Sequence, residues 1–199
     1  MAAYPDVLII GGGIIGLTTA YFLAREGVRV EIVDKGDLGQ EASWAGAGIL
    51  PAGDPVRARS PLDQLRAHSA VIFPELSAEL LEKTGIDNGY LRCGGLAFVD
   101  KESEAATDEW RNEEIPFELL EAKNVQRLEP AVAAGLAMAY HLPDMAQLRN
   151  PRHLKALLTA CQARHVRLQP GCPVHGFETQ GRSVLAAKSD RGPINARNY

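Results

Sequence analysis

Residues 6–24, DVLIIGGGIIGLTTAYFLA, constrain the fold of this chain more than any other stretch. From Val7 onward the stretch holds eighteen uncharged residues in a row, a length that could span a membrane or serve in a secretion signal. Its flanks argue against both, because no Lys or Arg precedes it, Asp6 adjoins it, and no small-x-small cleavage site follows before Arg25. Four glycines also weaken it as one helix, since each costs about 1 kcal/mol relative to alanine. We therefore expect neither a secretion signal nor a membrane span.

The same stretch divides into a strand, a glycine turn and a helix. The apolar block Val7–Ile10 predicts a strand buried on both faces, as in a parallel sheet, and residues 14–26 predict a helix closed by Gly27. The residues between them fit the pattern G-x-G-x-x-G with Gly11, Gly13 and Gly16. In that pattern the glycines permit a sharp turn, a close approach of backbone to a pyrophosphate, and close packing of helix and strand. The helix N-terminus attracts phosphate, so the turn predicts a dinucleotide site.

An acidic residue follows at the spacing that this site requires. The segment GVRVEIVD predicts a second strand, residues 28–33, that ends at Asp34, eighteen residues beyond Gly16. At roughly twenty residues from the glycines, a carboxylate meets the ribose hydroxyls of an adenine nucleotide. It accepts hydrogen bonds from a free 2′-OH and repels a 2′-phosphate. The order of strand, turn, helix, strand and acid favours a nucleotide site over a turn that only joins packed elements.

The residues after Asp34 depart from a nicotinamide-binding Rossmann domain. Such a domain continues into a further helix and strand, whereas residues 36–53 are rich in Gly, Ala and Ser and have no long apolar period. Small side chains suit a close approach of backbone to a flat ligand, and Trp44, Ile49 and Leu50 are awkward in a solvated linker. A bound ring system would explain both features. The departure also disfavours an NAD-linked dehydrogenase.

Composition disfavours several other classes of function. The chain has 199 residues, 46% of them hydrophobic, with a net charge of −4 and no cluster of Lys and Arg, so we expect no nucleic-acid partner. Its three cysteines show no C-x-x-C spacing and its five histidines form no ligand-spaced pair, so we expect neither a disulfide framework nor a metal site. We expect a cytoplasmic protein whose thiols are reduced and buried as small hydrophobes. The residues concerned are Cys93, Cys161, Cys172, His68, His141, His153, His165 and His175.

Two further helices are expected. The first begins at Ser60 and Pro61, with Ser60 as its cap and Asp63 reaching back, and ends at Gly85, while Pro74 should kink or divide it. The second begins at Asn150 and Pro151. Each carries an apolar stripe that we assign to the core: Leu62, Leu65, Ile72, Leu76 and Leu80 in the first, and Leu154, Leu157, Leu158 and Cys161 in the second.

The remaining segments predict strands. Residues 90–100 and 136–144 are expected to be strands joined by a turn and helix in residues 113–132, and they look like part of an inserted sheet because they interrupt the α/β order. Short strands with Gly-containing turns are expected in residues 165–177, 183–190 and 192–199.

The chain resembles the amino-terminal half of the glycine oxidase and D-amino-acid oxidase family of FAD enzymes, and most closely the glycine oxidases of thiamine biosynthesis. The resemblance rests on VLIIGGGIIGLTTAYFLAREG, VEIVDKG and EASWAGAGILPA, with weaker support from IDNGYLRCGGLAFV, RLEP and RNPRHLKALLTAC. The third block discriminates best, because the first two occur in many flavoproteins. Together the blocks span almost all of this chain but little more than half of a typical family member.

This resemblance implies an α/β fold with two parts. One is a Rossmann-like FAD-binding domain built on a parallel sheet, and the other is part of an inserted α+β substrate domain with an antiparallel sheet. The implied limits are residues 1–84 for the first FAD-binding segment, 85–146 for the substrate domain, and 147–199 for the second FAD-binding segment.

The resemblance also implies which residues contact FAD. The family's contacts at the pyrophosphate, the ribose, the flavin and the adenine fall in turn on Gly11, Gly13, Ile14, Ile15 and Gly16; on Asp34 and Lys35; on Ala42, Ser43, Ala47, Gly48 and Ile49; and on Val174. Asp34 lies where many relatives have Glu, which keeps the carboxylate. Ile49 and Leu50 lie where relatives often have a Met-Leu pair, a tolerable apolar exchange.

The activity implied is oxidation of glycine or a similar small amine or D-amino acid. A hydride passes from the substrate Cα to the flavin, the imine hydrolyses to a keto acid and ammonia, and O₂ is reduced to H₂O₂, so the partners are the amino acid and O₂. The family's substrate-holding Arg lies in the carboxyl-terminal half, beyond Tyr199, so we assign no catalytic residue. Two alternatives stay open: an FAD dehydrogenase that passes electrons to a quinone or carrier, and a truncated FAD-binding fragment without activity. Assembly as a homo-oligomer also stays open.

Overall fold

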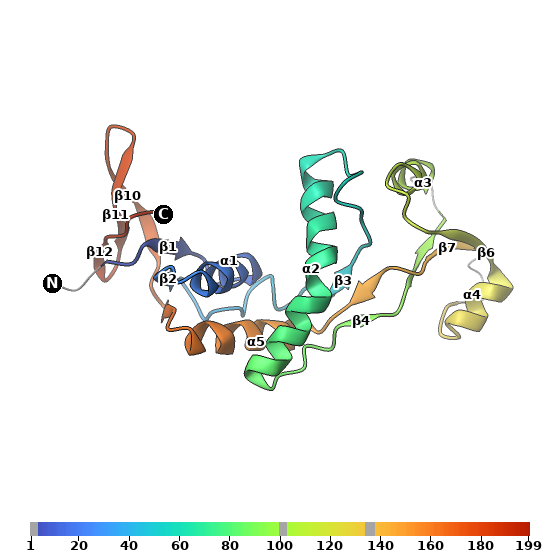
Figure 1. The fold of residues 1–199 in the computed structure, drawn as a ribbon, viewed down its shortest axis with the longest axis horizontal. Helices are drawn as coiled ribbons and strands as arrows, with labels where there is room; N and C mark the ends of the chain where they lie inside the picture. Colours follow the sequence, from blue (N-terminus) through green and yellow to red (C-terminus); the bar gives the residue numbers. More distant parts are fainter. Residues whose placement is uncertain (1–3, 100–102, 134–137) are drawn as a thin grey trace. The chain divides into compact units, whose positions relative to one another are not determined.

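The computed structural model describes residues 4–99, 103–133 and 138–199 (Figure 1). The chain divides into two compact units. Unit 1 comprises Met1–Ala47, Glu79–Asn88 and Arg149–Tyr199, and unit 2 comprises Gly48–Ala78 and Gly89–Leu148. The domain limits expected from the resemblance, after residues 84 and 146, stay a prediction. Asp100, Leu136 and Ala137, which belong to two expected strands, lie outside the described residues.

Unit 1 is built on a parallel sheet, as the two apolar blocks predict. β1 (Val7–Ile10), β2 (Val30–Val33) and β9 (Arg167–Gln169) lie side by side in the order β1-β2-β9. All four residues of β2 are buried, as befits the central strand. The burial predicted for both faces of β1 is wrong at Ile10, which is 44% exposed at the end of that strand. The expected second strand begins two residues late, at Val30. The parallel pairing confirms the Rossmann-like part of the predicted fold.

α1 (Ile14–Arg25) follows the glycine turn. It ends one residue earlier than expected, and it is closed by Gly27 as predicted. Gly27 takes the left-handed conformation, with φ of 78°. The Gly27 N–H donates to the carbonyl of Ala24 and the Val28 N–H donates to that of Leu23. These are the two hydrogen bonds of a Schellman motif, which satisfy helix carbonyls that would otherwise lack a partner.

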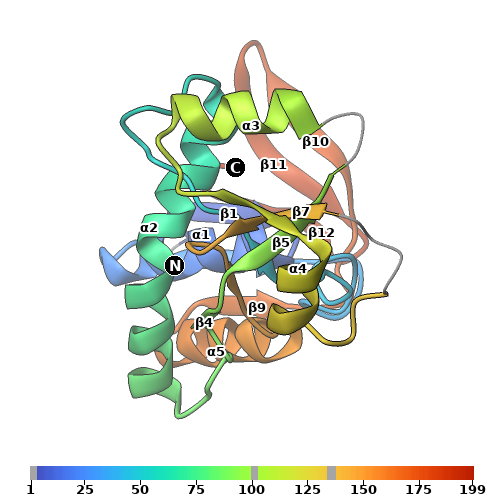
Figure 2. The ribbon, with the colours of Figure 1, turned by 90° about the vertical axis from the view of Figure 1, so that its right-hand side faces the viewer.

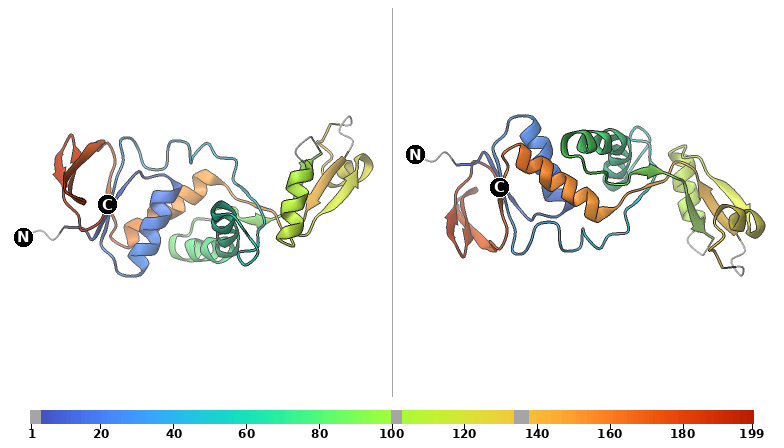
Figure 3. Two further views of the ribbon diagram at one scale, coloured as in Figure 1. Left: turned by 90° about the horizontal axis from the view of Figure 1, so that it is seen from above. Right: turned by 90° about the horizontal axis from the view of Figure 1, so that it is seen from below.

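α5 (Asn150–Ala163) packs against α1 in unit 1, and Figure 3 shows the two helices crossing. The predicted core stripe of α5 is confirmed for Leu154, Leu157 and Cys161, which are at most 2% exposed, and Leu158 is half-buried. The Cys161 thiol donates to the carbonyl of Leu17 on α1 at 3.5 Å. The stripe therefore holds the two helices together.

A second sheet of unit 1 is antiparallel. It contains β10 (Val174–Gln180), β11 (Ser183–Ser189) and β12 (Gly192–Ile194), in that order. Its inner residues join the core around Leu8 and Val33 of the parallel sheet. After β12 the chain returns to β1, where the Leu8 N–H donates to the carbonyl of Asn198.

Unit 2 holds two small antiparallel sheets. One has the order β3-β8-β4 and the other the order β5-β7-β6, and α4 lies against the second (Figure 2). These sheets confirm an antiparallel α+β part. The elements are β3 (Ile49–Leu50), β4 (Leu91–Arg92), β5 (Gly95–Phe98), α3 (Ser103–Asn112), β6 (Glu118–Glu121), α4 (Ala122–Leu128), β7 (Met138–Leu142) and β8 (Ala146–Gln147).

Two elements of unit 2 differ from expectation. The segment 113–132 contains β6 before α4, where only a turn and a helix were expected, and α3 was not expected at all. β6 has the sequence ELLE, and only Leu120 in it is buried. So short a strand shows no apolar alternation, and its identity comes from pairing with β7.

α2 (Pro61–Thr84) begins in unit 2 and ends in unit 1. The Ser60 Oγ atom accepts a hydrogen bond from the Asp63 N–H at 3.1 Å, which confirms the predicted cap. Gly85 closes the helix, with φ of 69° and its N–H donating to the carbonyl of Leu81. Pro74 lies inside the helix and does not divide it.

The core stripe predicted for α2 is wrong in its first half. Leu76 and Leu80 are at most 5% exposed, but Leu62, Leu65 and Ile72 are 74%, 63% and 43% exposed. The period of a sequence shows which residues share a helix face, and it does not show whether another element covers that face. Within the described residues, no helix is both long and apolar enough to cross a membrane.

Candidate functional site

The first feature of the candidate site is the turn between β1 and α1. Gly11 has φ of +110°, a conformation that side chains disfavour, and its N–H donates to the carbonyl of Val33 on the neighbouring strand at 2.8 Å. A Cβ at Gly16 would overlap the backbone oxygen of Gly11. The first and third glycines thus have the turning and packing roles that the motif predicts.

The carboxylate of Asp34 is fixed by two backbone amides. Its Oδ2 atom accepts a hydrogen bond from the Gly12 N–H at 2.7 Å, and its Oδ1 atom accepts one from the Gly36 N–H at 2.8 Å. Each oxygen keeps a further lone pair. Asp34 therefore joins the end of β2 to the glycine turn and can still accept hydrogen bonds from a ligand.

The N-terminus of α1 lies beside the segment that resembles the flavin-facing stretch. Gly13 is the N-cap of α1, and the N–H of Ile14 donates to the Ser43 Oγ atom at 3.0 Å. A Cβ at Gly13 would lie 3.1 Å from the same hydroxyl oxygen. The structure therefore brings Gly13, Ile14 and Ser43 together at a helix terminus, where phosphate binds well.

A cavity of about 510 Å³ adjoins this turn in unit 1. Its lining includes four predicted contacts, namely Gly11, Asp34, Lys35 and Val174. They come from the glycine turn, the end of β2 and the start of β10. The structure thus places the residues expected at the ribose and the adenine around one space, at the carboxyl ends of parallel strands, where ligands of open α/β sheets bind.

The other predicted contacts do not line this cavity. Ile15 is 76% exposed at the start of α1, and Ala42 and Ala47 are exposed in the segment that follows β2. Gly48 and Ile49 belong to unit 2, where the carbonyl of Gly48 accepts the Leu148 N–H and Ile49 is 60% exposed in β3. The roles of all these residues toward FAD stay predictions.

The structure adds residues that the sequence did not single out. Glu41 and His175 also line the cavity, and the Asn150 Nδ2 atom donates to the carbonyl of Ser43 at 3.0 Å. Asn150 is separated from Ser43 by more than a hundred residues, so no local pattern could identify the pair. The one local signal was its position at the start of a predicted helix.

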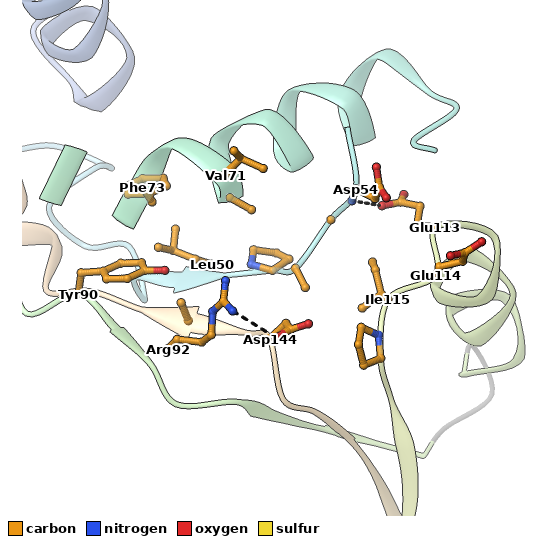
Figure 4. Close-up of a pocket in the computed structure, with 16 residues that line it drawn as sticks. Leu50, Asp54, Val71, Phe73, Tyr90, Arg92, Glu113, Glu114, Ile115 and Asp144 are labelled. Atoms are coloured by element: carbon orange, nitrogen blue, oxygen red, sulfur yellow. Dashed lines mark hydrogen bonds and ion pairs between the residues drawn. The ribbon is translucent and has the colours of Figure 1, made fainter. Parts of the chain in front are cut away.

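Unit 2 contains a separate cavity of about 250 Å³, shown in Figure 4, and none of the predicted FAD contacts lines it. Arg92 and Asp144 lie on one side of it, 3.5 Å apart. On another side Glu113, only 4% exposed, accepts a hydrogen bond from the Asp54 N–H and pairs with Arg66 at 3.0 Å. Its charged groups are thus paired within the protein.

The residues of unit 1 fit a dinucleotide. The turn requires glycine at Gly11, which has a positive φ, and at Gly16, where a Cβ would overlap the backbone of Gly11; α1 presents its N-terminus, and a fixed carboxylate adjoins the cavity. In the described parts of the chain, no group of three or more His, Cys, Asp or Glu side chains could hold a metal ion.

Comparison with known proteins agrees with this fit. A family model described as FAD dependent oxidoreductase (DAO) matches residues 6–198. The glycine oxidase of Pseudomonas aeruginosa is 32% identical over 94% of this chain and 52% of its own length, and a protein of Trichormus variabilis named bifunctional protein ThiO/ThiG is 29% identical over 98% of this chain and 30% of its own. The crystal structure of glycine oxidase from Geobacillus kaustophilus matches with a TM-score of 0.84 and 31% identity, over 98% of this chain and 54% of that one. The chain thus spans about half the length of the glycine oxidases that it matches.

Proposed function

Because this chain belongs to the family of FAD dependent oxidoreductases, we propose that it is the FAD-binding part of an enzyme that oxidises glycine or a similar small amine or D-amino acid. The products would be a keto acid, which is glyoxylate from glycine, together with ammonia and H₂O₂. The glycine oxidases among its relatives support this choice of substrate.

One observation carries the proposal. The glycine turn, the N-terminus of α1 and the doubly bonded Asp34 carboxylate meet beside one cavity in unit 1. In our proposal the backbone of Gly11, Gly13 and Gly16 admits the pyrophosphate, which lies beside Ile14 and Ile15 at the N-terminus of α1, while Asp34 and Lys35 bind the ribose. The flavin and the adenine would contact the remaining predicted residues, Ala42, Ser43, Ala47, Gly48, Ile49 and Val174.

FAD, when bound, supplies the acceptor for the two electrons that leave the substrate. The part of this chain is to bind and orient the cofactor through fixed backbone groups. No arginine here is assigned to the substrate carboxylate, so we name no catalytic residue.

We also propose that the whole enzyme serves thiazole and thiamine biosynthesis and works in the cytoplasm. The role in this pathway is supported by the resemblance to its glycine oxidases and by the similarity to the protein named ThiO/ThiG. The location is supported by the cysteine spacing, which suggests no disulfide framework.

The proposal is tested in two steps. First, the purified 199-residue chain is titrated with FAD and, separately, with NADH, and binding is followed by the quenching of ligand fluorescence. We expect FAD to bind more tightly than NADH, and a preference for NADH would contradict the cofactor assignment.

Second, the full-length gene product is purified and its visible spectrum recorded before glycine is added. We expect a bound flavin and release of H₂O₂ with glycine in air. Reduction of an artificial electron acceptor without any H₂O₂ would instead identify a dehydrogenase, and absence of both would contradict an oxidoreductase of amines.

A further inference from the structure

We propose that Asn150 is a positioning residue for the FAD site: its side chain holds the segment 43–47 so that the Ser43 hydroxyl lies at the N-terminus of α1. The inference rests on the proposed FAD site in unit 1. It concerns three residues distant in the sequence, Ile14, Ser43 and Asn150, that form one chain of hydrogen bonds.

The first link joins α5 to the segment after β2. Asn150 is the first residue of α5, and its side-chain amide does not cap its own helix, whose N-cap is Arg149. The Nδ2 atom of Asn150 instead donates to the backbone carbonyl of Ser43 at 3.0 Å, and both residues are half-buried. The amide therefore fixes the backbone of Ser43 from outside its own segment.

The second link joins Ser43 to α1. The Ser43 Oγ atom accepts the Ile14 N–H at 3.0 Å. The amides of a first helical turn have no partner within the helix, and they are the groups that bind phosphate at such termini. A hydroxyl at this position can also donate its proton to a phosphate oxygen, because it is both donor and acceptor.

The close approach of Gly46 to Asn150 is a second observation that supports this arrangement. A Cβ on Gly46 would overlap the Nδ2 atom of Asn150. The segment can pass Asn150 at this distance only because residue 46 has no side chain. Substitution of Gly46 should therefore displace the amide that substitution of Asn150 removes, so both changes should break the same link.

The experiment compares Asn150→Ala, Gly46→Ala and the double variant with the parent chain. The control is Gln162→Ala, which removes an exposed amide from the last turn of the same helix. FAD dissociation constants are measured by fluorescence quenching at a temperature where circular dichroism shows every variant folded. Hydrogen exchange of the Ile14 amide is measured in the absence of FAD.

We expect each single substitution to weaken FAD binding by roughly five- to tenfold, the effect of one lost hydrogen bond. The double variant should bind no more weakly than the weaker single variant, because both changes break one link. The Ile14 amide should exchange faster in Asn150→Ala, and Gln162→Ala should match the parent in both measurements.

Three results would overturn the inference. They are an unchanged FAD affinity in Asn150→Ala, losses that multiply in the double variant, and an unchanged Ile14 exchange rate. A lowered melting temperature with unchanged FAD affinity would show a purely structural role. If the parent chain bound no FAD, the proposed site would fail, while the exchange rate of Ile14 would still decide whether Asn150 controls Ser43.

Discussion

Gly13 and Gly16 belong to one motif, yet their surroundings differ. The nearest atom to a Cβ at Gly13 is a rotatable hydroxyl oxygen, whereas a Cβ at Gly16 would overlap the backbone of Gly11. A hydroxyl can turn aside, but backbone oxygen cannot move without shifting β1. The overlap at Gly16 therefore ties that glycine to the packing of the helix on the strand, while the approach of the pyrophosphate at Gly13 stays a prediction from the motif.

The two glycines should respond differently to substitution. We expect Gly13→Val to abolish FAD retention with little change in melting temperature, because the branched side chain stands where the pyrophosphate approaches. Gly16→Ala should lower the melting temperature by several degrees even without FAD. Circular dichroism and flavin absorbance of both variants provide the comparison, and a Gly13→Val chain that kept its flavin would refute the assignment of the turn.

His153 is a buried histidine whose neutral form is favoured. It is 1% exposed, the Asn88 amide lies 3.0 Å from its Nδ1 atom, and burial lowers its pKa from 6.5 to about 4. The unfolded chain therefore takes up a proton at a higher pH than the folded chain does. The free energy of unfolding should therefore decrease as the pH falls from 6.5 toward 4, by up to about 3 kcal/mol.

This pH dependence can be measured by urea unfolding between pH 7.5 and pH 4. We expect the free energy of unfolding to decrease through this range in the parent, and to decrease less steeply in His153→Gln, which removes the titrating group. Equal slopes in the two proteins would show that His153 does not determine the acid sensitivity.

The helices show what local sequence determines. The start of α2 follows from its capping residue, because Ser60 satisfies an amide of the first turn. The end of α1 follows equally from Gly27. Such ends depend on neighbours in the sequence and can be predicted without knowledge of the fold.

The cap of α2 gives a test of this view. We expect Ser60→Ala to destabilise the chain by about 1 kcal/mol, and Ser60→Thr to retain most of the stability because its hydroxyl can also accept the Asp63 N–H and donate to the Asp63 carboxylate. Thermal unfolding of the three proteins measures the difference. A fully stable Ser60→Ala chain would show that the cap contributes nothing.

Other features depend on partners that are distant in the sequence. β6 is a strand because β7 pairs with it, and Leu62 and Leu65 are exposed because no described element covers them. In the candidate site, the glycine pattern and the spacing to Asp34 could be read directly, whereas the hydrogen bonds of Asn150 and Ser43 needed the fold. Sequence therefore identified the elements of unit 1 more completely than the contacts between them.

In the molecule as a whole, the fold buries two of the three cysteine thiols away from solvent. Cys161 and Cys172 are 0% exposed and Cys93 is exposed, so the expectation of buried cysteines is wrong for Cys93. Burial also raises the pKa of the Cys161 thiol to about 12, which keeps it in its unreactive protonated form. The cysteines thus report on the integrity of the core in unit 1.

We expect a maleimide reagent to modify one thiol in the native chain and three after unfolding in guanidinium chloride. Mass spectrometry of the labelled chain gives the count, and Cys93→Ser should show no labelling in the native state. Rapid labelling of Cys161 in the native chain would contradict the packing of α5 on α1.

The bonds of Asp34 to Gly12 and Gly36 restrict how this protein could be re-engineered. Exchanging Asp34 for a neutral or basic residue, the obvious route to a phosphorylated ribose, would also release the backbone amides of Gly12 in the glycine turn and of Gly36 after β2. At this position one side chain therefore determines both the choice of ribose and the local backbone structure. A designer who wants a different coenzyme should keep the aspartate and add the new charge at a neighbouring side chain.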